Sequence, residues 1–246
     1  MTRLVVVTGG GGGIGRATAA RFEALGDDVL APGRAECDVT DEASVNAFFE
    51  RAGAVDVLVN NAGMGESAPL ARTTLESWRA HLDVNATGAF LCTRAVVGGM
   101  RERGRGAVVT VASTAGRAGA PYTAAYTASK HAAVGLMRAA AAELAGTGVS
   151  ANAVCPAFVD TPMTERSVAN IVERTDRSRD EARAALTGAL GRLLDPDEVA
   201  AAVVWLDTLA PNVVLPEVEL SSVDTGPFAP EVFVPAQARR LGRTEL

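Results

Sequence analysis

Lysine is almost absent from this 246-residue chain. Of the 23 basic residues, all but Lys130 are arginines. The compact ammonium of lysine and the planar guanidinium of arginine are not interchangeable. We therefore expect Lys130 to perform a task that arginine cannot.

An excess of positive charge and a long apolar run are also missing. The 23 basic residues face 29 acidic ones, so the formal net charge is −6, which argues against a dedicated nucleic-acid or anionic-membrane binder. No stretch of about 18 apolar residues is present, so no membrane span is expected. The apolar run at 4–7 is too short for the core of a signal peptide, and the expected location is the cytoplasm.

Cysteine and histidine are few and scattered. They are Cys37, Cys92, Cys155, His81 and His131. The odd cysteine count, the wide spacing and the lack of a CxxC pair predict neither a disulfide framework nor a zinc site. We interpret both histidines as structural and expect no metal.

Short β-branched runs alternate with longer Ala-, Leu- and Arg-rich segments. The predicted strands are 4–8, 28–31, 56–62, 107–113 and 149–156. The predicted helices are 15–25, 41–52, 75–102 and 123–146. Strands that are apolar on both faces and separated by helices indicate a parallel sheet covered on both sides. The expected fold class is α/β, a doubly wound Rossmann-type domain that spans residues 1–246.

One connection is too short for this pattern. Only residues 32–36 separate the second strand from the apolar segment 37–39, whereas a parallel crossover needs about a dozen residues. We therefore predict that the third strand and the helix before it are truncated, and that 37–39 runs as an extended loop. A full helix between residues 32 and 40 would contradict this prediction.

A run of glycines joins the first strand to the first helix. The segment from Thr8 to Gly15 reads TGGGGGIG. Glycines allow a tight turn and let backbone N–H groups approach a pyrophosphate at the N-terminus of the helix. We therefore predict a dinucleotide site here; a flexible loop is the alternative.

Five motifs together resemble the short-chain dehydrogenase/reductase family. They are TGxxxGxG (8–15), NNAG (60–63), Asn85 in LDVNATG, Ser113, and YxxxK (Tyr126 and Lys130). The resemblance extends from residue 4 to about residue 206. It is closest to polyketide and 3-oxoacyl ketoreductases and to hydroxyacyl-thioester dehydrogenases.

The candidate catalytic residues are Ser113, Tyr126, Lys130 and Asn85. Tyr126 and Lys130 lie at positions i and i+4 of a predicted helix, so they share one face. An ammonium about 4 Å from a phenol is expected to lower its pKa by roughly three units. The resemblance implies that Ser113 orients the substrate oxygen and that Asn85 holds a water linked to Lys130.

Further residues follow from the resemblance as cofactor contacts. The set comprises Gly9, Gly13, Ile14, Gly15, Arg34, Asp38, Val39, Asn60, Ala62, Gly63, Tyr126, Lys130, Val159 and Thr161. Asp38 and Val39 are expected at adenine, and Val159 and Thr161 at the carboxamide. Ala157 stands where the family usually has glycine.

The end of the second strand bears on the choice of cofactor. Gly33 falls where an acidic residue would select NAD, and Arg34 follows it, which favours NADP(H). If Arg34 is merely solvated, NAD(H) stays open.

The segment at about 163–195 corresponds to the family's substrate lid. Its basic residues have two interpretations: they bind a phosphorylated carrier, such as CoA or the phosphopantetheine of an acyl carrier protein, or they form a solvated helix face. These residues are Arg166, Arg174, Arg177 and Arg179. Val168, Ile171 and Val172 face either substrate or core. The tail at about 221–246 departs from the family; it wraps a neighbouring subunit, caps the site or is loosely ordered.

The expected function is an NADP(H)-dependent oxidoreductase that interconverts a secondary alcohol and a ketone, with 3-oxoacyl/3-hydroxyacyl thioesters or polyketide-type compounds as candidate substrates. The alternatives are an NAD-dependent alcohol or hydroxyacyl dehydrogenase, an epimerase or dehydratase on the same scaffold, and a non-catalytic cofactor-sensing module. The resemblance further implies a homodimer or homotetramer built on helices near 86–102 and 127–145.

Overall fold

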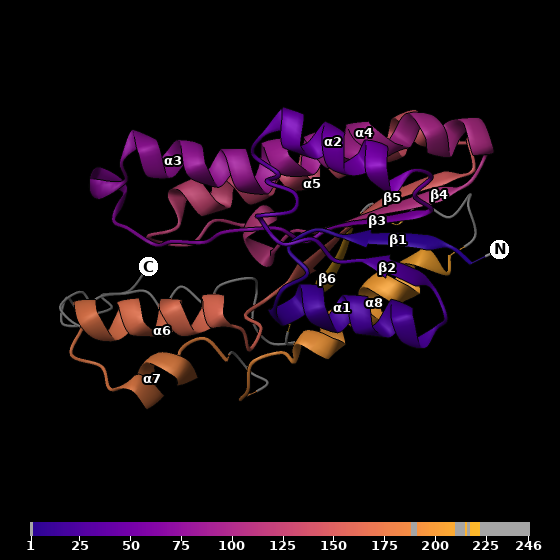
Figure 1. The fold of residues 1–246 in the computed structure, drawn as a ribbon. Helices are drawn as coiled ribbons and strands as arrows, with labels where there is room; N and C mark the ends of the chain where they lie inside the picture. Colours follow the sequence, from indigo (N-terminus) through magenta and orange to yellow (C-terminus); the bar gives the residue numbers. More distant parts are fainter. Residues whose placement is uncertain (1, 188–190, 210–214, 216, 222–246) are drawn as a thin grey trace, which may run out of the picture.

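The computed structural model describes residues 2–187, 191–209, 215 and 217–221. Its strands form one parallel sheet in the order β2-β1-β3-β4-β5-β6 (Figure 1). The strands are β1 (Leu4–Val7), β2 (Asp28–Leu30), β3 (Val57–Asn60), β4 (Gly106–Val111), β5 (Val149–Pro156) and β6 (Glu217–Leu220). The expected α/β class with a doubly wound parallel sheet is confirmed.

Helices cover both faces of the sheet. They are α1 (Gly13–Ala24), α2 (Glu42–Ala52), α3 (Leu75–Leu82), α4 (Gly88–Arg103), α5 (Ala124–Leu144), α6 (Pro162–Arg174), α7 (Arg179–Ala184) and α8 (Pro196–Asp207). Helices α2, α4 and α5 pack on one face and α1 and α8 on the other, each with its own apolar core. Within the described residues, no helix is both long and apolar enough to cross a membrane.

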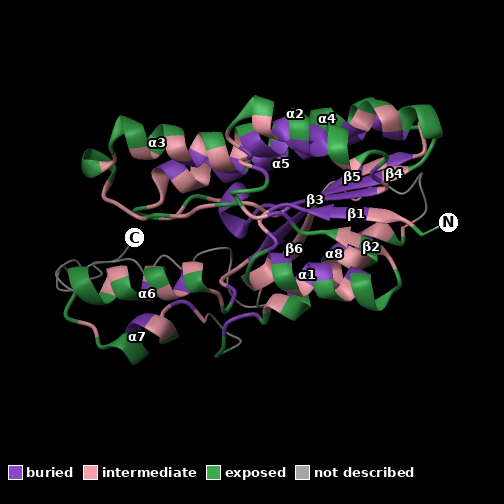
Figure 2. Cartoon of the chain, in the orientation of Figure 1, coloured by how far each residue is buried: buried purple, intermediate pink, exposed green. Residues whose placement is uncertain are grey.

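The central strands are the most buried part of the molecule (Figure 2). Every residue of β3 is buried, and β1 becomes fully buried after Leu4. These runs of valine fit a strand that packs against helices on both faces. The sheet is therefore a rigid base, and the loops at the carboxyl ends of its strands hold the polar residues described below.

The short connection after β2 forms as predicted. No helix or strand lies between β2 and α2; the chain makes a turn in which the Glu36 and Cys37 amides both donate to the Gly33 carbonyl, at 3.1 and 3.0 Å. Val39 then enters the core. Cys37 and Cys92, far apart in the sequence, both lie in this core as free thiols.

The predicted helix 75–102 is not one regular helix. A π-helical turn at Asp83–Thr87 interrupts it between α3 and α4. Periodicity alone does not reveal such a turn, because the apolar spacing on either side stays helical. Strand β6 was likewise not expected from the sequence.

Candidate active site

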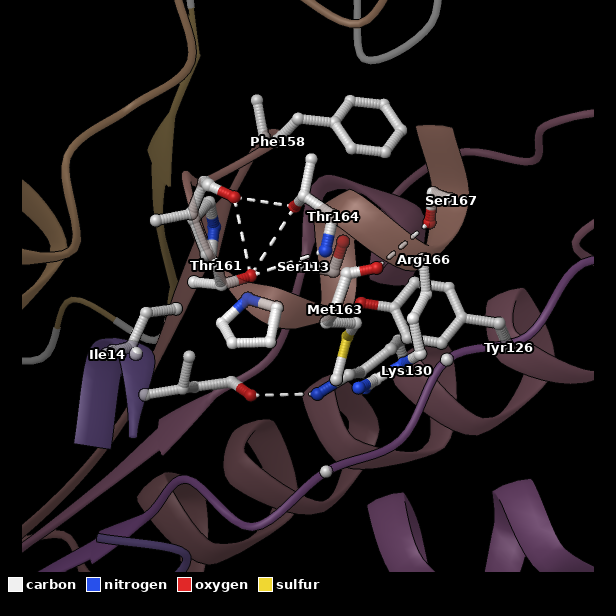
Figure 3. Close-up of a pocket in the computed structure, with 18 of the residues that line it drawn as sticks. Ile14, Ser113, Tyr126, Lys130, Phe158, Thr161, Met163, Thr164, Arg166 and Ser167 are labelled. Atoms are coloured by element: carbon white, nitrogen blue, oxygen red, sulfur yellow. Dashed lines mark hydrogen bonds between the residues drawn. The ribbon is translucent and has the colours of Figure 1, made fainter. Parts of the chain in front are cut away.

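A cavity of about 360 Å³ opens at the carboxyl ends of the strands (Figure 3). It is lined by the turn after β1, the loops after β3, β4 and β5, the start of α5, and α6. Ligands of open α/β sheets bind in this position. The cavity therefore brings together residues from the two ends of the motif pattern, near 9–14 and near 113–130.

The glycine turn is shaped by close contacts. Gly9 and Gly13 have φ of +65° and +51°, which glycine adopts without strain. A Cβ on Gly15 would lie 2.5 Å from the Gly9 carbonyl oxygen. Gly9, Gly13 and Ile14 line the cavity, whereas Gly15 packs behind the turn.

The start of α1 is open toward the cavity. No side chain caps its first turn, and no acidic residue lies there. Its free N–H groups and the positive end of the helix dipole therefore suit the pyrophosphate of a dinucleotide. The predicted cofactor residues at this end fit such a group.

Asn61, which the predicted set omits, braces the turn. Its amide nitrogen Nδ2 donates to the carbonyls of Thr8 and Gly9, both at 3.0 Å, and the Thr8 hydroxyl accepts from the backbone N–H groups of Asn61 and Ala62 at 3.1 Å. Asn61, Ala62 and Gly63 line the cavity.

Asn60, by contrast, lies inside the fold. It is buried and donates to the hydroxyls of Thr93 and Thr110, at 2.9 and 3.2 Å. As the last residue of β3 it points toward α4, so it does not line the cavity as expected. The signal available in the sequence is that the apolar run ends at Val59, three residues before the predicted strand end at 62.

Ser113, Tyr126 and Lys130 come together on one wall of the cavity. Ser113 follows β4, and the other two lie one turn apart on α5. Lys130 is 5% exposed; its Nζ donates to the Val111 carbonyl at 2.9 Å and lies 5.8 Å from the centre of the Tyr126 ring. The spacing in the sequence thus translates into one cluster.

The pKa of Tyr126 is shifted in the direction opposite to the expectation. Burial raises it, because a phenolate would lose its hydration, and a hydrogen bond with Ser113 only partly opposes this. Lys130 does not lower it, because its ammonium lies 5.8 Å from the ring centre and donates to the Val111 carbonyl instead. Burial lowers the pKa of Lys130 itself to about 8. The phenol is therefore protonated at neutral pH.

Asn85 lies in the π-helical turn and beside this cluster. Its Nδ2 donates to the Met64 carbonyl and the Ser129 hydroxyl, and its Oδ1 accepts from the Met64 N–H, all at 2.9 Å. A Cβ on Gly63 would lie 3.2 Å from Asn85 Oδ1 and 3.6 Å from Lys130 Nζ, so a glycine separates the two side chains. Asn85 fixes the loop after β3 against α5.

The residues expected at the adenosine end lie outside the cavity wall. Arg34 is 82% exposed, and its Nε donates to Asp38 at 2.9 Å. Hydrogen bonds from the side chain and backbone of Thr40, together with Arg34, lower the pKa of Asp38. Val39 is buried against Gly88. Arg34 is thus near the surface, with an acidic partner.

The segment after β5 forms the opposite wall. Ala157, Val159 and Thr161 all line the cavity. The Ala157 N–H donates to the Leu220 carbonyl at 2.8 Å, and the Thr161 hydroxyl accepts from the Thr164 N–H at 3.4 Å at the start of α6. Alanine in place of glycine is therefore accommodated with an ordered backbone.

Two helices, α6 and α7, lie in the segment predicted as the lid. Val168 is buried between them with Ala182 and Leu186, whereas Ile171 lines the cavity and Val172 is exposed. The three apolar positions thus divide between core, cavity and solvent. Residues 188–190 of the lid and 222–246 of the tail lie outside the described residues.

Comparisons with known proteins agree with this geometry. A family model described as short chain dehydrogenase matches residues 33–171. Over 240 residues the chain is 39% identical to a Streptomyces virginiae protein named as a ketoacyl reductase of the monensin polyketide synthase, with 85% of this chain and 92% of the relative covered. It is 40% identical over 198 residues to a 3β-hydroxysteroid dehydrogenase of Mediterraneibacter gnavus, covering 70% and 71%.

Solved structures give the same result. A variant of actinorhodin polyketide ketoreductase, solved with NADPH, matches with a TM-score of 0.81 and 33% identity, covering 89% of this chain and 96% of that one. Levodione reductase matches with a TM-score of 0.79 and 31% identity, covering 89% and 96%.

Proposed function

Because the chain belongs to the short-chain dehydrogenase family, we propose that it is an NADP(H)-dependent oxidoreductase that reduces a ketone to a secondary alcohol. The observation that carries the proposal is the meeting of Ser113, Tyr126 and Lys130 with an open glycine turn in one cavity. Relatives named as ketoacyl or polyketide reductases make β-ketoacyl thioesters and polyketide-type ketones the first substrates to test.

The three side chains have distinct tasks in this reaction. A nicotinamide cofactor held in this cavity would provide the hydride chemistry. The protonated Tyr126 hydroxyl donates a proton to the substrate oxygen, which suits the direction of reduction, and Ser113 hydrogen-bonds to the same oxygen. Lys130 holds positive charge beside the tyrosine and would bind the cofactor's ribose, while Asn85 keeps the loop after β3 in place.

The cofactor would occupy the cavity from the glycine turn to the segment after β5. Its pyrophosphate would bind at Gly9, Gly13 and Ile14, and its carboxamide near Val159 and Thr161. Arg34, which leaves Asp38 for a 2′-phosphate, would select NADP(H). The proposed homodimer or homotetramer, the cytoplasmic location and a carrier-bound substrate stay predictions.

The choice of cofactor has a direct test. We expect wild-type kcat/KM to be higher with NADPH than with NADH, and Arg34→Ala to lower the NADPH value by about tenfold or more, because a charge-assisted bond is lost. Turnover with NADH serves as the internal control and should be unchanged. Equal or better wild-type turnover with NADH would contradict the role of Arg34.

The reaction is tested by removing one hydroxyl. Tyr126→Phe should abolish ketone-dependent NADPH oxidation while NADPH binding, followed by fluorescence, stays largely intact. Tyr122→Phe is the matched control, since Tyr122 is the other tyrosine of the chain and is 41% exposed. Near-normal activity of Tyr126→Phe would defeat the mechanism, and turnover without net NADPH consumption would favour an epimerase or dehydratase.

A further inference from the structure

The lid arginines differ in what they bind. Arg174 donates to the Ser67 carbonyl at 2.8 Å. Arg179 and Arg183 both pair with Glu165, and Arg183 also pairs with Asp160 at 2.7 Å. These three guanidiniums are thus used within the protein.

Arg166 has no such partner. With the residues that the structure describes, its guanidinium forms neither a hydrogen bond nor an ion pair, and it precedes the paired arginines in the sequence. It is also the lid arginine that lines the cavity (Figure 3). The four arginines named from the sequence therefore divide. Arg174 and Arg179 are bonded within the protein and Arg177 also has a partner, whereas Arg166 faces the ligand space.

Helix α6 sets the position of Arg166 relative to Tyr126. Met163, Arg166 and Ser167 share one face of α6, at i, i+3 and i+4, and all line the cavity. A Cβ on Gly65 would lie 3.3 Å from both Met163 Sδ and Tyr126 Cε2, so Met163 is next to the tyrosine. Arg166 lies three residues after Met163, which is nearly one helical turn, and a turn rises about 5.4 Å along the helix axis.

The charge on this wall is not neutralised. Among the residues that the structure describes, the other charged side chains that line the cavity are Lys130, which is buried against the Val111 carbonyl, and Glu66, which forms no ion pair with Arg166. An exposed guanidinium in an otherwise largely apolar wall is suited to a carboxylate or phosphate, which it binds in bidentate fashion.

We infer that Arg166 determines specificity by binding an anionic group of the substrate, a carboxylate or a phosphate, at a distance from the carbonyl that is reduced. The inference rests on the proposed ketone reduction and narrows its substrate class. Neutral ketones of the same shape would be poorer substrates, since nothing would pair with the guanidinium.

Matched ketones test this inference. A keto acid and its methyl ester are compared on wild-type protein, on Arg166→Gln and on the control Arg179→Gln, whose arginine is paired within the lid. In Arg166→Gln we expect the KM for the acid to rise by about tenfold or more, with kcat and all values for the ester nearly unchanged. To test whether the anion is a phosphate, the KM values for a β-ketoacyl group on CoA and on N-acetylcysteamine, which lacks phosphate, are compared on the same proteins.

Either of two kinetic results would overturn the inference: equal wild-type KM values for the charged and the neutral ketone, or an equal rise in KM for both in Arg166→Gln. Calorimetric binding of the hydroxy acid and its ester provides a readout that does not need turnover. If no ketone is reduced but Arg166→Gln still weakens binding of the acid alone, the proposed reaction fails and the anion site stands. Equal binding of acid and ester refutes the anion site.

Discussion

Lys130 shows why a single residue type is retained in a chain that otherwise uses arginine. It is almost fully buried and binds a backbone carbonyl rather than a carboxylate. Arginine stays charged at such a site, whereas lysine can lose its proton when burial lowers its pKa. The scarcity of lysine correctly directs attention to this position. One physical reason for a lysine at this position is therefore that its amine can become neutral, which a guanidinium cannot.

This property predicts a pH-dependent stability. The pKa of Lys130 is about 8 in the folded protein and about 10.5 in the unfolded chain, so between these values the unfolded state holds more protons and stability rises with pH. Relative to Lys130→Met, the wild-type free energy of unfolding should therefore gain up to about 3 kcal/mol between pH 7 and pH 10. Urea denaturation of both proteins without cofactor measures this gain. Unfolding free energies that change with pH in parallel for the two proteins would contradict the prediction.

At the scale of elements, β6 links the loop after Ser113 to the edge of the sheet. Arg117, just after the 3₁₀ turn η3 (Thr114–Gly116) that follows Ser113, pairs with Glu217 at 3.0 Å and with Glu219. Arg138 on α5 pairs with Glu217 at 2.6 Å. The two segments that hold Ser113, Tyr126 and Lys130 thus form ion pairs with one acidic strand.

Loss of this link should affect activity more than stability. Arg117 is 37% exposed, so Arg117→Gln should cost about 1 kcal/mol or less in unfolding free energy, yet lower kcat severalfold because the Ser113 loop is less well fixed. Arg94→Gln is the control: its arginine is 44% exposed and pairs with Glu42 away from the cavity. Equal kcat values in the two variants would leave the network a purely structural role.

For the whole molecule, the sequence predicts what depends on local pattern and chain length. Five strands and the truncated crossover follow from apolar runs and from a connection too short for a helix. Strand β6 does not, since its alternating Glu217 and Glu219 become stable only beside arginines from distant segments. The motif spacing predicts that Ser113, Tyr126 and Lys130 lie together. The direction of the pKa shift of Tyr126 depends on burial and on the distance between Lys130 Nζ and the ring, and motif spacing gives neither.

The missing third strand leaves β2 as an edge of the described sheet. An edge strand offers unpaired backbone groups to other chains, which favours aggregation. Here the edge has three residues, begins with exposed Asp28, and follows Asp27, which Arg3 holds at 2.7 Å. The short length and the negative charge of β2 therefore keep the open backbone groups of this edge from pairing with another copy of the chain.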